Sequence, residues 1–422
     1  MSANSPQPTP AIAKPQRFHG FDALRGGAML LGIVLHAAIT HMEAPMEGLL
    51  WPLTEQPKHI SFDAMFWWIH GWRIPLFFVM AGFFAAMLAR RRGPSGFLKH
   101  RVLRILIPVA VASVTLLPLM YVLWSWGWLS EGRVRWEEVY QVDFDTAEFE
   151  DSFMGPAHLW FLNYLVVFSF VYWAVLKLRK SKPTDDEPTL GPRRKWCFTS
   201  AFRPLVFALP TFAFLVYDPG FYLAYHHIIP LTLEQWGYEL LQLVYQGYYF
   251  AVGIYLFRLH REMDAIKRYA WLYLGLAQVV FIVGVFMHAG WSNNESFGGE
   301  YQQAFGIGLA LCVALFCWLM IWGMTGIGLT ILAKPRAIVR WLSDSAYWVY
   351  LVHLPIVVVL MMLFKDWPVG PWVKFVLIVS VTSVVTLVSY QWGVRHTLVG
   401  RWLNGPRARP AEAEKTKPSD LG

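Results

Sequence analysis

Two long apolar segments near the N-terminus carry charged and histidine side chains at helical spacing. In the first, Arg25 precedes His36 by eleven residues, so the two lie on nearly one helix face, about 16 Å apart along the axis. Asp22 stands three residues before Arg25 and can pair with it. His36 can serve as a general base or as a neutral hydrogen-bonding residue between helices. Arg25 alone fits a boundary residue that reaches toward water, but the two together favour a functional site.

The second segment places Asp63, His70 and Arg73 on one broad helix face. Arg73 lies far from either end of the apolar stretch. A guanidinium at that depth needs a carboxylate, a cavity or an anionic ligand, because burying an unpaired charge is expensive. The sequence therefore predicts either an anion-binding Arg73 or an ion pair with a carboxylate on another helix.

Later segments add weaker candidates. Arg101 and Arg104 are neighbours on a helix beside a basic connection, where they could clamp a phosphate or simply mark a membrane boundary. His158 opens the fourth apolar segment and His353 lies in the middle of the ninth, and either could be a satisfied histidine of a helix bundle. Trp160 could stack on a sugar ring or belong to an aromatic belt at the membrane interface.

Common catalytic and metal-binding motifs are missing from the sequence. It contains no GxSxG elbow, no HExxH pair and no Walker lysine loop. The three cysteines have neither the number for a disulfide framework nor the spacing of a zinc site. The sequence predicts no metal ion and no permanently bound cofactor.

The composition indicates a membrane protein. Of 422 residues, 56% are hydrophobic and only 15% are charged, whereas about 25% are charged in an ordinary soluble domain. Apolar segments of bilayer-spanning length must be helical, because lipid cannot satisfy exposed backbone groups. We therefore expect an all-α polytopic membrane bundle with about ten transmembrane helices. The ten segments lie near residues 22–42, 62–89, 102–126, 157–177, 203–218, 235–257, 269–289, 304–333, 342–364 and 371–395.

Lysine and arginine gather in alternate connections and in the C-terminal tail. The positive-inside rule then places both termini in the cytoplasm, and it explains the net charge of +8 without a nucleic-acid partner. The outward connection 127–156 is acidic. The N-terminus lacks a signal-peptide pattern. We divide the chain into an N-terminal tail (1–20), a transmembrane domain (21–398) and a C-terminal tail (399–422), both tails cytoplasmic.

An ordered set of motifs resembles the integral-membrane acyltransferase-3 family. The first is a basic residue, ten others and then histidine, reproduced by Arg25 and His36. The remaining matches are Arg73 with Phe77-Phe78-Val79 and Gly82-Phe83, then Arg101 and Arg104 before Pro108, then His-Leu-Trp-Phe-Leu at 158–162, and Tyr350-Leu-Val-His353. The sequence departs at Ala81, where the family often has serine.

The resemblance implies an enzyme of the bacterial inner membrane. It would move an acyl group, with succinyl favoured and acetyl possible, from cytoplasmic acyl-CoA to hydroxyls of a periplasmic glucan or envelope glycan. His36 would be the general base and Arg73 would stabilise the oxyanion or bind a succinyl carboxylate. Arg25 would belong to the catalytic group with His36 and Arg73, and it would also bind CoA together with Arg101 and Arg104. The residues expected to contact substrate are Asp22, His70, His158, Trp160 and His353.

Two other functions remain open. Buried arginine and histidine also mark the substrate pathways of transporters and flippases. The absence of an internal repeat and the spacing of Arg25 and His36 count against that function. Covalent product formation separates an acyltransferase from a transporter. A non-catalytic scaffold or sensor is the third possibility, and it predicts that His36→Ala leaves the cellular phenotype unchanged.

Overall fold

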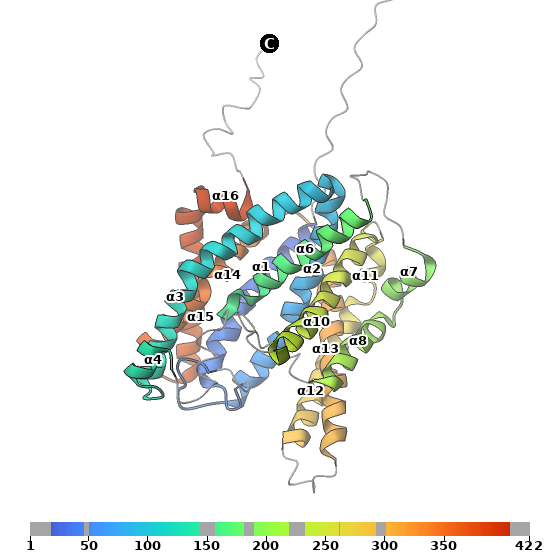
Figure 1. Ribbon diagram of the computed structural model, residues 1–422. Helices are drawn as coiled ribbons and strands as arrows, with labels where there is room; N and C mark the ends of the chain where they lie inside the picture. Colours follow the sequence, from blue (N-terminus) through green and yellow to red (C-terminus); the bar gives the residue numbers. More distant parts are fainter. Residues whose placement is uncertain are drawn as a thin grey trace, which may run out of the picture.

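The protein is a bundle of long helices (Figure 1). The structure, a computed structural model, describes residues 18–45, 50–143, 157–180, 190–218, 233–260, 262–292 and 301–405, and within these ranges it contains no strand. The predicted all-α membrane bundle is confirmed. The outward connection 127–156 is described only to residue 143, and the two predicted tails lie largely outside the described residues.

Each of the ten predicted segments coincides with helix. The first half of the chain forms α1 (His19–Ala38) with η1 (Ile39–His41), α2 (Ile60–Arg101), η2 (Val102–Leu106), α3 (Ile107–Ser130), α4 (Trp136–Gln141), η3 (Ala157–Leu159), α6 (Trp160–Leu178), α7 (Pro192–Thr199) and α8 (Arg203–Tyr217). The second half forms α10 (Leu233–Phe257), α11 (Asp264–Lys267), α12 (Ala270–Ser292), α13 (Gln302–Ile331), α14 (Ala337–Phe364), α15 (Pro371–Ser389), η5 (Tyr390–Val394) and α16 (Leu398–Asn404).

The structure gives the positions of the helices, and their length and apolarity bear on how many of them cross a membrane. By length and apolarity, eight stretches of the described residues could cross a membrane, or nine if α7 and α8, bent by 95°, form one broken span. Two of the predicted segments, now α2 and α3, fall inside one such stretch, Ile60–Ser130. Figure 1 shows the chain rising through α2 and descending through α3. The count of ten stays a prediction.

The second helix is long and kinked, as its apolar length predicts. It covers 42 residues and contains one non-helical residue, Gly93, at φ 67°. That left-handed conformation suits glycine, which has no Cβ, and Pro94 follows it. The kink follows Arg90, Arg91 and Arg92 and separates them from the last part of α2, which carries Lys99 and Arg101.

Small residues set the distance between central helices. A Cβ on Gly82 of α2 would overlap the carbonyl oxygen of Phe250 in α10, and one on Gly253 would overlap that of Val79. The two backbones therefore touch, which favours association in lipid. Helix α1 packs against α2, α13, α14 and α15, so its side chains occupy the interior of the bundle.

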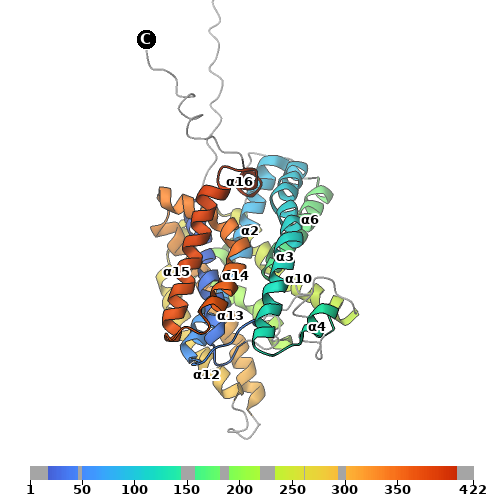
Figure 2. The ribbon, with the colours of Figure 1, turned by 90° about the vertical axis from the view of Figure 1, so that its left-hand side faces the viewer.

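The beginning and the end of the described chain meet at one end of the bundle, which we call the basic end. There Arg25 of α1 bonds Ser343 of α14, and Asn404 of α16 bonds the Asp344 carbonyl. Figure 2 shows α16 across this end, next to the turn between α2 and α3. The opposite end, where α1 runs into residues 39–45, is called the outer end.

Candidate active site in the bundle interior

Three histidines from distant parts of the sequence meet inside the bundle. The ring of His353 in α14 lies 5.3 Å from that of His36 in α1 and 5.5 Å from that of His158 in η3, between ring centroids. His158 and His353 are almost fully buried, and His36 is partly buried. The sequence identified each histidine as a separate candidate, and the structure shows that the three lie together.

Hydrogen bonds assign the tautomers of two of these rings. Nδ1 of His353 lies 2.8 Å from the Tyr350 carbonyl oxygen and 3.0 Å from that of Val349. A carbonyl can only accept, so Nδ1 carries the hydrogen and Nε2 keeps a lone pair in the neutral ring. Nε2 of His158 likewise donates to the Leu351 carbonyl at 3.0 Å, which leaves its Nδ1 as the acceptor.

A proline inside α14 explains why His158 docks there. Pro355 has no N–H, so the carbonyl four residues earlier, that of Leu351, loses its helical donor. His158 supplies the missing donor, and Tyr350 returns a bond from its hydroxyl to the His158 carbonyl. The proline in Leu354-Pro355 was the sequence signal for this contact, and our sequence analysis did not use it.

Arg73 completes the interior site. It is 8% exposed, and a Cβ on Gly32 would overlap its Nη1 atom, so the guanidinium lies directly on α1 one turn before His36. Among the described residues no carboxylate forms an ion pair with Arg73, and its Nε has no hydrogen-bond partner. The ion-pair alternative therefore finds no support there. A buried guanidinium with unused donors suits an anion or a developing oxyanion.

Trp51 covers His36 on the outer side. Its ring lies parallel to the imidazole, with 5.8 Å between centroids and 5° between planes. Trp51 is 3% exposed and belongs to the segment between α1 and α2. Sequence reasoning missed this residue, because a lone tryptophan in a connection gives no periodic signal.

His70 of α2 and Trp160 of α6 both pack against aromatic side chains. His70 stacks on Phe66, with 5.4 Å between centroids. Trp160 packs edge-on against Tyr164 at 5.8 Å. Asp63, which shares a helix face with Arg73, instead accepts the backbone N–H groups of Glu43 and Ala44, each at 2.9 Å. Asp63 thus anchors the chain after α1.

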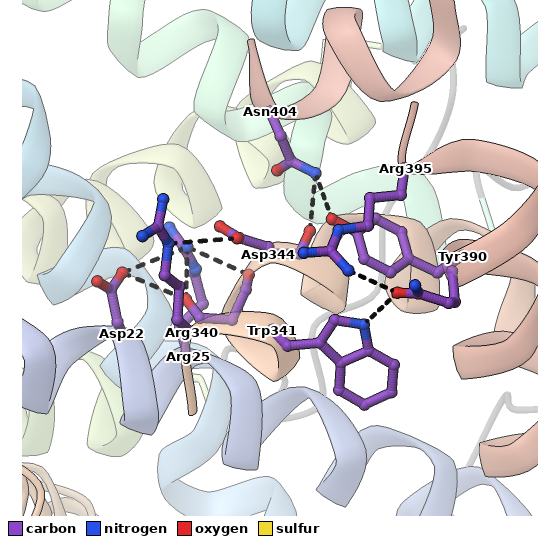
Figure 3. A network of polar contacts seen from close by, with 10 residues as sticks. Asp22, Arg25, Arg340, Trp341, Asp344, Tyr390, Arg395 and Asn404 are labelled. Atoms are coloured by element: carbon purple, nitrogen blue, oxygen red, sulfur yellow. Dashed lines mark hydrogen bonds and ion pairs between the residues drawn. The ribbon is translucent and has the colours of Figure 1, made fainter. Parts of the chain in front are cut away.

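At the basic end, Arg25 belongs to a separate polar network (Figure 3). It donates to Ser343 Oγ at 2.6 Å and lies 3.4 Å from Asp22 Oδ1, as its spacing to Asp22 predicts. Arg340 and Asp344 continue the network, with 4.0 Å between their charged atoms. Arg25 and His36 thus sit in different surroundings, and a shared catalytic role for Arg25 stays a prediction.

Arg101 and Arg104 do not lie side by side on a regular α-helix, as the predicted phosphate clamp requires. The backbone from Val102 to Leu106 is π-helical, which changes the angle between the two side chains. The Arg101 guanidinium lies 5.3 Å from the Phe97 ring centroid, while that of Arg104 lies against Gly405. Arg101 Nε is buried with no partner among the described residues. Beside them a groove of 380 Å³ opens between α2, η2 and α6, and its lining includes Lys99 and Lys177.

The site is built from neutral and cationic groups. No group of three His, Cys, Asp or Glu side chains within the described ranges is placed to hold a metal ion. Imidazole nitrogens with free lone pairs can take a proton from a hydroxyl, and the neighbouring guanidinium can stabilise negative charge on oxygen. Proton abstraction from an alcohol next to an oxyanion site is the chemistry of acyl transfer.

Comparison with known proteins gives the same class. A family model described as an acyltransferase domain matches residues 18–391, and the chain belongs to that family of membrane acyltransferases. Similar proteins include the glucans biosynthesis protein C of Salmonella schwarzengrund (strain CVM19633), of Salmonella typhi and of Salmonella typhimurium, each 22% identical over 354 residues, covering 82% of this chain and 83% of the relative. No solved structure matches the chain. The protein is thus a multi-pass membrane acyltransferase.

Proposed function

We propose that this acyltransferase moves an acyl group, preferably succinyl, from acyl-CoA at the basic end to a hydroxyl of a glucan or related envelope glycan at the outer end. The observation that carries the proposal is Arg73, a buried guanidinium with unused donors, beside the histidine cluster. The relatives named for glucan biosynthesis support a glycan acceptor. The basic end would face the cytoplasm of a bacterial inner membrane.

The proposed reaction uses the groups in the interior. His36 takes the proton from the acceptor hydroxyl while the hydroxyl oxygen attacks the thioester carbonyl. Arg73 stabilises the oxyanion or, with a succinyl donor, holds the free carboxylate. The C–S bond then breaks and CoA leaves as the thiolate. His353 and His158 contact the reacting groups, and His70, Trp160 and Asp22 contribute to substrate binding.

The groove at the basic end would receive the donor. Lys99 and Lys177 line it, and Arg101, the last residue of α2, precedes the π-helical turn beside it, with an Nε that has no partner among the described residues. Phosphates of CoA would bind these cations together with Arg104 and Arg25. An acetyl donor would use the same route. Because an acetyl group has no carboxylate, it would gain nothing from an anion-binding Arg73.

The test supplies the purified protein with radiolabelled succinyl-CoA or acetyl-CoA and a neutral β-glucan. Wild type is compared with His36→Ala, and with His260→Ala as a matched control, since His260 is also buried and stacked on an aromatic ring. We expect label on the glucan with wild type and His260→Ala, and none with His36→Ala. Equal transfer by His36→Ala would overturn the role of His36. Uptake of glucan into vesicles without covalent label would favour a transporter.

A further inference from the structure

Among the residues that the structure describes, none forms a hydrogen bond that fixes the orientation of the His36 ring. A catalytic imidazole usually gives one nitrogen to a carboxylate or carbonyl, which sets its tautomer and its angle. Nδ1 of His36 is buried without a partner among the described residues. Its two ring neighbours are Trp51, parallel at 5.8 Å, and His353, tilted by 42° at 5.3 Å. The orientation of His36 therefore depends on stacking.

Trp51 is itself held on several sides. Its indole N–H donates to Thr40 Oγ1 at 3.2 Å, and its carbonyl accepts from Arg133 Nη1 at 2.7 Å. Trp124 of α3 packs edge-on against it at 5.3 Å and bonds the neighbouring Leu50 carbonyl at 3.1 Å. A ring fixed in this way can act as a rigid support.

The segment that carries Trp51, residues 50–59, is tied to three helices, and we call it the outer strap. Glu131, after α3, accepts from the Thr54 hydroxyl at 3.3 Å and pairs with Lys365 at 2.9 Å. Glu55 pairs with Lys374 of α15, with both side chains less than 10% exposed. The Glu55 N–H also returns to the Thr40 carbonyl, at 3.0 Å. The strap thus holds Trp51 against one face of the His36 ring.

We propose that Trp51 is a positioning residue, which holds the imidazole of His36 at the angle needed to take the proton of the acceptor hydroxyl. The inference rests on the proposed role of His36 as general base. A misplacement of about 1 Å can slow a reaction about 100-fold. Loss of the Trp51 ring is therefore expected to lower kcat strongly, while the affinity for the substrate changes little.

The test compares Trp51→Phe with Trp51→Leu in the glucan acylation assay. Phenylalanine keeps a flat ring on His36 and loses the indole N–H, so we expect kcat within about threefold of wild type. Leucine keeps apolar volume and loses the stacking, so we expect kcat to fall about 10- to 100-fold with little change in KM for the glucan. Trp318→Leu is the matched control, since Trp318 of α13 is fully buried and stacks on Tyr249 of α10, with 5.3 Å between ring centroids. It should lower the melting temperature and leave kcat unchanged.

A second readout does not depend on activity. Diethyl pyrocarbonate modifies exposed imidazoles, and mass spectrometry reports the rate at each histidine. We expect His36 to react several-fold faster in Trp51→Leu than in wild type or Trp51→Phe, with the rate at His260 unchanged. Equal rates at His36 in all three proteins would show that Trp51 does not hold this ring, and would overturn the proposal.

The His36→Ala background separates this inference from the proposed function. If Trp51 acts through His36, adding Trp51→Leu to His36→Ala produces no further loss of residual activity. A further 10-fold loss would assign Trp51 another role. If His36→Ala is inactive while Trp51→Leu is as active as wild type, His36 remains the proposed general base, but the positioning role of Trp51 is refuted. If His36→Ala is fully active, the proposed function fails first.

Discussion

Two buried arginines of this protein differ in what their guanidinium groups touch. Arg203 of α8, which is fully buried, donates to the carbonyl oxygens of Ala265 and Ile266, at 3.0 and 2.8 Å, so it ties two elements together. Arg73 is almost as buried but rests on Gly32, and among the described residues it forms no hydrogen bond or ion pair with another side chain or carbonyl. Arg203 thus satisfies backbone carbonyls, whereas the donors of Arg73 are available for the anion that we propose.

Substituting lysine separates the two roles. Lysine retains the charge but not the planar fork of donors. We expect Arg73→Lys to lower kcat for succinyl transfer about 100-fold, the usual loss for one oxyanion donor, with a melting temperature near that of wild type. Arg203→Lys should do the reverse, with lower thermal stability and near-normal kcat. Full activity of Arg73→Lys with a succinyl donor would rule out bidentate recognition by Arg73.

The glycine under Arg73 offers a gentler perturbation. A Cβ at position 32 would overlap Arg73 Nη1, whereas a Cβ at position 27 of the same helix meets no atom within 4 Å. We expect Gly32→Ala to lower kcat at least 10-fold by displacing the guanidinium. Gly27→Ala should leave kcat unchanged and slightly raise stability, since alanine favours helix. Steady-state kinetics of the two variants checks this, and equal activities would mean that Arg73 relaxes without consequence.

At the scale of elements, α14 organises the site through its irregularity. Pro355 frees the Leu351 carbonyl for His158, and the carbonyls of Val349 and Tyr350 take Nδ1 of His353. One turn of helix thus fixes the tautomers of two imidazoles. A regular helix would have used the Leu351 carbonyl internally.

Replacing Pro355 should therefore affect activity more than folding. Alanine restores an N–H that competes with His158 for the Leu351 carbonyl. We expect Pro355→Ala to reduce kcat about 10-fold and to keep or raise the melting temperature, since proline inside a helix is unfavourable. Pro118→Ala is the control, because Pro118 lies exposed inside α3 away from the histidines. If the two variants have the same kcat, the bond between Leu351 and His158 has no part in turnover.

The sequence predicted which helices exist better than it predicted what meets between them. Hydrophobic length placed helix over all ten expected segments, and apolar depth marked Arg73 as unusual. Helical spacing also paired Asp22 with Arg25. It could not bring His158 to His353, because that contact depends on how two helices pack. It assigned Trp51 no role, since a connection has no period, and it treated Arg101 and Arg104 as neighbours on a regular helix where the backbone is π-helical.

For the molecule as a whole, charge is arranged differently at the two ends. At the basic end Lys99 and Lys177 line a groove and form no ion pair among the described residues, whereas Lys365 and Lys374 at the outer end are paired with Glu131 and Glu55. Cations near an outward surface oppose the positive-inside rule. Their pairing with carboxylates neutralises them and secures the strap over the interior.

The pair of Glu55 and Lys374 predicts how stability depends on pH. Burial raises the pKa of Glu55, and the nearby Lys374 ammonium opposes this change without cancelling it. The folded state then holds the Glu55 proton more tightly than the unfolded chain, so this carboxyl makes the free energy of unfolding fall as pH rises from the usual carboxylate range through the raised pKa. We expect the melting temperature of Glu55→Gln, relative to wild type, to rise over that interval. A constant difference would contradict this.

The kink in α2 allows the sequences on its two sides to change independently during evolution. Gly93 interrupts the helix between Arg73 and the Arg101–Arg104 turn. A residue added to a continuous helix rotates everything beyond it by about 100°. Here the break absorbs such a rotation, so the helical phase of Arg101 and Arg104, which we propose to bind the donor, is not locked to that of Arg73. Sequence drift at the basic end can then retune the proposed fit to a donor without turning the Arg73 guanidinium away from α1.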